Sequence, residues 1–107
     1  MIIDPKDSDS NYYMGLIYLM GLGVNQNFPK ALAHFEITKN DSRAINAIGY
    51  IYFKAPDYFE QDPAILSRFG NIKKDLKKAR DNFQKAAGLG NLNALYNMGC
   101  FHLSSQT

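Results

Sequence analysis

Residues 44–52 read AINAIGYIY, and this stretch decides the fold because its pattern occurs three times in the 107-residue chain. Residues 10–18 read SNYYMGLIY, and residues 94–102 read ALYNMGCFH. Each copy has a small residue, an apolar residue four positions later, a glycine next, and an aromatic or imidazole ring three positions after the glycine. Such internal self-similarity is the sequence signature of a repeat architecture.

A second motif follows each of the first two copies. Residues 30–35 read KALAHF and residues 78–83 read KARDNF, so a Phe comes four positions, about one helical turn, after an Ala. We therefore expect A helices, which carry the glycine motif, to alternate with B helices, which carry the Lys-Ala motif, in the order A, B, A, B, A. The predicted fold class is all-α.

The glycine of each A helix predicts a close contact between helices. A glycine inside a helix costs about 1 kcal/mol relative to alanine. Gly15, Gly49 and Gly99 occupy equivalent places, so each needs a compensating contact over its missing side chain. We expect the Ala of the B helix to approach from the opposite wall, with Phe35 and Phe83 filling the wedge between neighbours.

Together these segments resemble the Sel1-like repeat family, which is related to the tetratricopeptide repeats. Residues 14–24 follow that family's Leu-Gly-x-x-Tyr-x-x-Gly-x-Gly-Val pattern closely, with Gly21 and Gly23 suited to a tight turn at positive φ. Residues 78–91 follow the second half of the pattern. The resemblance covers roughly residues 10–102 and implies a right-handed α–α superhelix of about two and a half helix–turn–helix repeats.

The repeat register divides the chain into an arm and three repeats. Residues 1–9 are expected to form a polar N-terminal arm, residues 10–40 the first repeat, and residues 41–91 the second. Residues 92–107 supply only the A helix of an incomplete third repeat. The second repeat carries an insertion at 54–74 where the family has a short turn, and its prolines predict a loop.

The resemblance implies that the A helices line a concave surface. On each A helix, the positions three before, one after and four after the glycine form one stripe. The residues predicted to bind a partner there are Tyr12, Leu16, Leu19, Asn46, Tyr50, Phe53, Tyr96 and Leu103, and Cys100 shares the stripe. An exposed patch that is mostly apolar or aromatic marks an interaction site.

The insertion offers an alternative to partner binding. Its apolar side chains, among them Tyr58 and Phe59, could fold back over the concave surface and cover it. Residues 64–69 are expected to form a short helical turn with Asp62 as its N-cap. Partner binding and self-covering both remain open from the sequence.

The residues that could support catalysis or bind a metal are few. His34, Cys100 and His102 are the only residues of the usual nucleophile and metal-ligand types apart from carboxylates, and a zinc site needs three or four ligands at workable spacing. Cys100 and His102 lie two positions apart on a predicted helix and so point to different faces. We expect no catalytic site, no metal and no cofactor.

Composition excludes several other functions. A net charge of +2 with mixed signs does not favour nucleic acid, and the basic run at residues 73–80 is typical of a solvated helix face. The chain shows no signal peptide and no apolar run long enough to insert into a membrane. A single cysteine rules out an internal disulfide, which favours a soluble intracellular protein in a compartment that the sequence does not identify.

These observations favour a non-catalytic adaptor or scaffold module that binds a peptide or protein surface on its concave face. The alternative is a small structural subunit buried permanently in a larger assembly, because a solenoid normally needs polar capping repeats. The expected partner is a protein or peptide, and the uncapped C-terminal helix adds self-association as a further route. An enzyme is the least favoured class.

Overall fold

The computed structural model describes residues 7–54, 63–64 and 74–105. In these ranges the chain is helical, with no strand, which confirms the predicted all-α class. The helices are α1 (Ser8–Met20), α2 (Phe28–Ile37), α3 (Ser42–Lys54), α5 (Leu76–Gly88) and α6 (Leu92–Ser105). The helix α1 begins at Ser8, inside the expected N-terminal arm. The expected helical turn at 64–69 lies outside the described residues, except for Ala64.

Local capping explains where the helices begin and end. The side chains of Asp7, Asn27 and Asp75 each accept a hydrogen bond of 3.0 Å from the backbone N–H three residues on, at the start of α1, α2 and α5. The helix α1 ends where Gly21 takes a φ of 70°, and Gly23 in the following turn has a φ of 76°. Both values lie in the left-handed region that glycine adopts without steric cost, as the sequence predicted.

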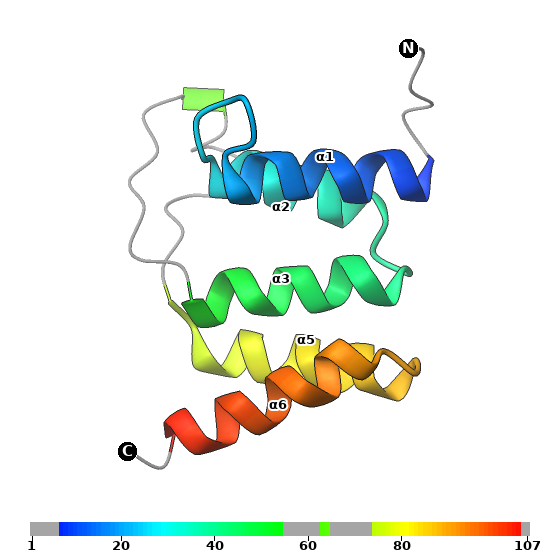
Figure 1. The fold of residues 1–107 in the computed structure, drawn as a ribbon, viewed down its shortest axis with the longest axis vertical. Coiled ribbons are helices and arrows are strands. Elements are labelled where there is room, and N and C mark those ends of the chain that lie inside the picture. The colour runs from blue at the N-terminus through cyan, green and yellow to red at the C-terminus, as the bar shows by residue number, and fades with distance from the viewer. Residues whose placement is uncertain (1–6, 55–62, 65–73, 106–107) are drawn as a thin grey trace.

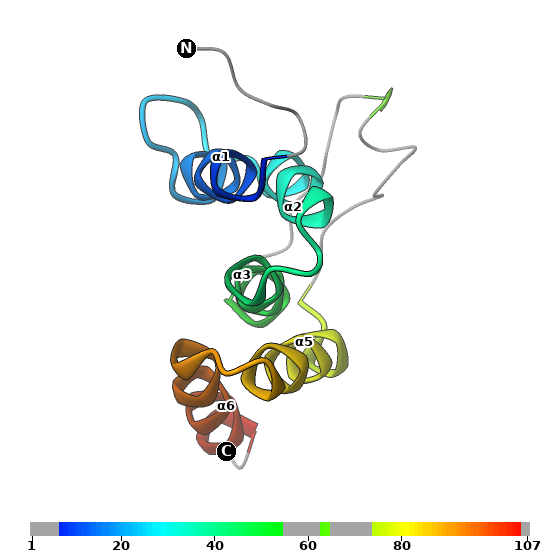
Figure 2. The same ribbon diagram turned by 90° about the vertical axis from the view of Figure 1, so that its right-hand side faces the viewer.

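The helices form two layers, as the predicted alternation of A and B helices requires. Figure 1 shows α1 and α2 at one end of the molecule, α3 in the middle, and α5 and α6 at the other end. In Figure 2, α1, α3 and α6 lie on one side and α2 and α5 on the other. The A helices therefore form one layer and the B helices the second, and α3 joins the two repeats.

In each of the first two repeats, a phenylalanine ring of the B helix packs over the glycine of the A helix and holds the two helices together. A Cβ added to Gly15 would overlap the ring of Phe35, and one added to Gly49 would lie 2.7 Å from the ring of Phe83. Both rings are fully buried, with exposed fractions of 0%. The predicted close contact over glycine is therefore confirmed in the first two repeats. A Cβ added to Gly99 would meet nothing within 4 Å.

Candidate functional site: a groove between the first two A helices

A groove of about 490 Å³ lies between α1 and α3. Five of the residues that the sequence predicted to bind a partner line it, namely Tyr12, Leu16, Leu19, Asn46 and Tyr50. The other lining residues are Met20, Gln26, Phe28, Arg43, Ala47, Ile51 and Asn97. The expected stripe on the A helices thus comes together as one concave surface for the first two repeats.

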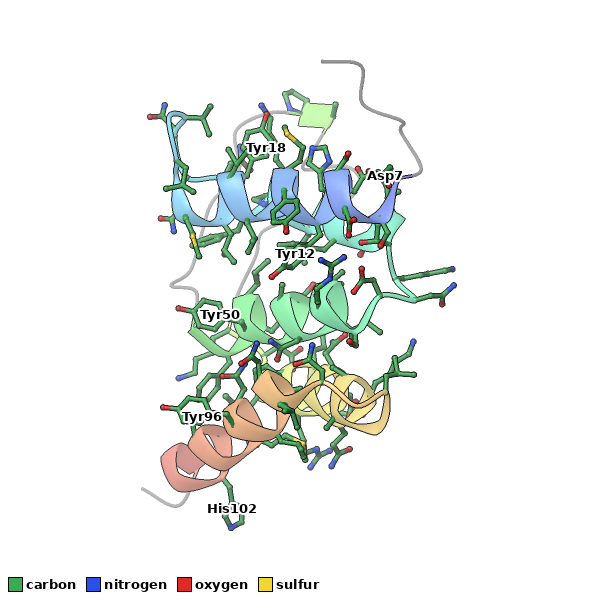
Figure 3. The ribbon with its side chains drawn as sticks, turned by 45° about the vertical axis from the view of Figure 1, so that its right-hand side comes forward. Asp7, Tyr12, Tyr18, Tyr50, Tyr96 and His102 are labelled. Atoms are coloured by element: carbon green, nitrogen blue, oxygen red, sulfur yellow. The ribbon has the colours of Figure 1, made fainter. Side chains whose placement is uncertain are left out.

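The groove has an apolar floor and an exposed rim. Leu19, Phe28 and Ile51 are buried, and they belong to the core that joins α1, α2 and α3. Met20 and Tyr50 line the same groove but are 61% and 43% exposed. Figure 3 shows the Tyr50 side chain projecting outward from α3. Large apolar side chains on a rim above a buried floor can close over an incoming side chain without reorganising the helices.

Charged groups fix the end of the groove at Tyr12. The guanidinium of Arg43 lies 4.6 Å from the centre of the Tyr12 ring, and its Nη2 lies 2.7 Å from Oδ2 of Asp41 and 2.6 Å from Oδ1 of Asp9. Hydrogen bonding from Arg43, followed by that from the Ser8 hydroxyl, holds the pKa of Asp41 well below its usual range. The pKa of Arg43 is raised, chiefly by the Asp41 carboxylate. This network ties α1 to the start of α3.

Amide side chains lie elsewhere on the groove wall. Nε2 of Gln26 donates a hydrogen bond of 2.7 Å to the backbone oxygen of Leu19. Nδ2 of Asn97 on α6 donates one of 2.9 Å to Oδ1 of Asn46 on α3. Asn46 therefore holds α6 against α3 as well as lining the groove, so changing it would affect both the fold and the surface.

Three of the predicted site residues are not among those that line the groove. Phe53 is only 6% exposed, and its ring packs against Phe83 and Phe101 at centroid distances of 6.1 and 5.5 Å. The prediction placed Phe53 on the concave face, whereas α5 and α6 enclose it in the core. Tyr96 is 74% exposed on α6, and the side chain of Leu103 lies outside the described residues.

Several groove residues were missed by the sequence-based prediction. Gln26 comes from the segment that joins α1 to α2, and Phe28 is the first residue of α2; the repeat pattern assigns neither a surface role. Arg43 lies in the first turn of α3, and only its neighbour Asp41 and the facing Tyr12 make it part of the groove. The helical periodicity predicts which positions of one helix line the groove, but it does not predict the residues that close the two ends of the groove.

Two reactive side chains outside the groove are held by contacts within the protein. Nδ1 of His34 donates a hydrogen bond of 3.1 Å to Oδ1 of Asn11, and burial lowers the pKa of His34. The pKa of Tyr96 is raised, mainly by its hydrogen bond with the thiol of Cys100. Across 7–54, 63–64 and 74–105, no three His, Cys, Asp or Glu side chains gather as a metal ion would require.

The helices are also too short or too polar for a membrane span. In the part of the chain that the structure describes, none combines the length and the apolarity that crossing a bilayer needs.

The comparisons with known proteins agree with the repeat pattern. The family model for the Sel1 repeat matches residues 8–40 and 64–91, together more than half of the chain. A crystal structure of a Sel1 repeat protein from Oxalobacter formigenes is similar, with 27% sequence identity, a TM-score of 0.61 and coverage of 89% of this chain. The chain spans about a third of that protein, 34% of its length. No curated protein matches this sequence significantly.

Proposed function

This chain belongs to the Sel1 repeat family, whose helical repeats generally mediate protein–protein interactions, and from that premise we propose that it binds a peptide segment of another protein in the groove between α1 and α3. The observation that carries the proposal is the exposed rim of Met20 and Tyr50 above a buried apolar floor. Aromatic side chains beside a desolvated pocket commonly supply most of the binding energy of an interface.

The size and chemistry of the groove indicate the kind of ligand. A volume of about 490 Å³ lies within the range of roughly 300–1,000 Å³ that is typical of sites for small ligands. Such a groove takes a few apolar side chains of a peptide rather than a whole helix. Gln26 and Asn46 line the wall and can guide the polar backbone of the peptide.

The proposed role is that of a non-catalytic adaptor or scaffold. The family to which the chain belongs is a helical repeat scaffold, not a family of enzymes. The residues of the groove are suited to holding apolar side chains, because its reactive groups are limited to the ring hydroxyls of Tyr12 and Tyr50 and the ion-paired Arg43.

Peptides selected on the purified protein from a random phage-displayed library would test the proposal. The dissociation constant of the best peptide would be measured by fluorescence anisotropy for the wild type, for Tyr50→Ala and for the control Ile37→Ala. Ile37 is 49% exposed at the end of α2 and does not line the groove. We expect Tyr50→Ala to weaken binding by about tenfold or more, and the control to bind like the wild type. Equal affinity for all three proteins would exclude the groove as the binding site.

The alternative of a permanently buried structural subunit has one observation in its favour. Leu92, Leu95 and Tyr96 of α6 are 77%, 52% and 74% exposed, which is unusual for large side chains of this kind on neighbouring turns. A wild-type chain that stays monomeric and soluble over a concentration series would count against this alternative.

A further inference from the structure

The first repeat shows what occupies the glycine face of an A helix. On α1, Gly15 lies under the ring of Phe35. One turn earlier, Asn11 is only 3% exposed and accepts a hydrogen bond from His34 of α2. One turn later, the ring of Tyr18 lies 5.4 Å from the ammonium group of Lys30. The B helix α2 thus covers the positions four before, at and three after the glycine.

The second repeat builds the same arrangement from different side chains. On α3, Gly49 lies under the ring of Phe83. Ile45, four positions earlier, is 2% exposed and packs against Ala86 of α5. Tyr52, three positions later, has the ammonium group of Lys78 at 5.1 Å from its ring. The Lys-Ala-x-x-x-Phe motif of the B helix therefore docks twice on one and the same surface of an A helix.

The third A helix carries this surface without a described helix on it. Leu95, Gly99 and His102 occupy the same positions on α6, yet Leu95 is 52% exposed, in contrast to Asn11 and Ile45. Gly99 itself is exposed, and a Cβ added to it would meet nothing within 4 Å. Figure 2 shows α6 at the outer end of the stack.

The opposite face of α6 explains why the helix still holds its place. Ala94 is fully buried, and Met98 and Phe101 pack against the core formed by Phe53, Ala79 and Phe83. One face of α6 is thus packed against the core, while the surface around Gly99 is exposed. Beside it lies a hollow of about 450 Å³, which is lined by Arg80, Phe83, Gln84, Met98, Gly99, Phe101 and His102. This hollow is a second apolar recess, and it lies between α5 and α6 next to Gly99.

We propose that the face of α6 formed by Leu92, Leu95, Gly99 and His102 binds an amphipathic helix of a partner protein that carries an Ala-x-x-x-Phe motif. The Phe ring lies on Gly99, as Phe35 and Phe83 lie on Gly15 and Gly49. A folded second copy cannot supply this helix, because its own Phe35 and Phe83 are fully buried. The proposal concerns a different surface from the groove between α1 and α3 and does not depend on it.

The experiment uses a synthetic peptide with the sequence of residues 74–91 of this chain, labelled with fluorescein, as a model of the partner helix. We expect it to bind the wild-type protein saturably, and to bind Gly99→Leu at least about tenfold more weakly because a side chain there blocks the ring. Gly99→Leu should not lower the melting temperature, since the added Cβ meets nothing within 4 Å. A peptide with Phe83→Ala should lose affinity to the same extent.

Controls separate this surface from other modes of binding. A peptide that displaces the protein's own α5 would bind Gly99→Leu as well as the wild type, and that result would overturn the proposal. Tyr50→Ala should leave the peptide affinity unchanged, so failure of the groove and failure of this surface are distinguishable. Light scattering should show a monomer. If the wild type is instead a dimer and Gly99→Leu dissociates it, the face mediates self-association and the proposal of a partner helix is wrong.

A second measurement tests the same contact without an isolated peptide, because a short peptide forms little helix on its own. The same segment would be appended to the C-terminus through a flexible Gly-Ser linker, and the melting temperature compared with that of the parent chain. We expect the appended helix to raise the melting temperature and Gly99→Leu to abolish the increase. An appended segment that leaves the melting temperature unchanged, with no saturable peptide binding, would refute the proposal.

Discussion

The guanidinium of Arg43 on α3 lies 4.6 Å from the centre of the Tyr12 ring on α1, so one cation closes the end of the groove and joins the first two repeats. The same guanidinium pairs with Asp9 of α1 and with Asp41 before α3. Tyr12 is therefore held at the end of the groove by residues that lie close to it in space and that the repeat pattern does not connect with it.

Replacing Asp41 should change the pH dependence of stability. Arg43 depresses the pKa of Asp41 in the folded protein, so the stabilising contribution of Asp41 is fully present above the unfolded value of about 3.9. It declines as pH falls from that value toward the depressed pKa of the folded protein. At pH 7 we expect Asp41→Asn to unfold at a lower urea concentration than the wild type, with a loss of about 1 kcal/mol in the free energy of unfolding. The loss is small because Arg43 is partly exposed. The difference between the two proteins should shrink steadily as pH falls below about 4, because the unfolded chain then takes up the proton before the folded one. A difference that stays constant between pH 5 and pH 2.5 would argue against the ion pair as its cause.

His34 should make the folded protein less stable as the solution becomes mildly acidic. Burial lowers its pKa, so the unfolded chain binds the proton first, and stability falls as pH drops through the unfolded value of about 6.5. Urea unfolding at pH 7.5 and pH 5.5 would measure this loss. We expect His34→Gln to be less stable overall but to show a smaller change between the two pH values. An identical change in both proteins would assign the effect to other groups.

Gly49 and Gly99 should respond in opposite ways to the same substitution. Gly49→Ala places a Cβ 2.7 Å from the Phe83 ring and 3.2 Å from the Ala79 backbone oxygen. Overpacking of this kind commonly costs about 1–3 kcal/mol, and Gly49→Leu should unfold the stack. Gly99→Ala adds a Cβ in open space and should stabilise the helix by up to about 1 kcal/mol. Thermal unfolding of both variants would check this, and a stable Gly49→Leu protein would contradict the repeat register.

Phe53 and Tyr50 should separate stability from binding. Phe53→Ala removes a ring that is only 6% exposed and contacts Phe83 and Phe101, so we expect a loss of about 3–5 kcal/mol in the free energy of unfolding. Tyr50→Ala removes a side chain that is 43% exposed and should change stability by less than about 1 kcal/mol. Urea titrations followed by circular dichroism would measure both. Equal losses would place Tyr50 in the core.

The sequence by itself determined the helices and the contacts between A and B helices within a repeat. Gly15 with Phe35 and Gly49 with Phe83 could be predicted because a mid-helix glycine is costly and a ring four residues after an alanine fits over it. These contacts follow from a residue spacing that recurs along the chain, so the order of residues is enough to find them. Asp7, Asn27 and Asp75 begin helices by local hydrogen bonds as well, but the repeat pattern did not identify them and placed Ser8 in the N-terminal arm.

Only the tertiary structure decided which part of the concave stripe stays exposed and which part is buried. Tyr50 and Phe53 lie on the same stripe of α3, yet Tyr50 faces the groove and Phe53 is enclosed by Phe83 of α5 and Phe101 of α6. Helical periodicity assigns a residue to a face, but the positions of neighbouring helices decide how far each face is covered. Arg43 and Gln26 line the groove although they lie outside the stripe, because the tertiary structure brings them to its ends.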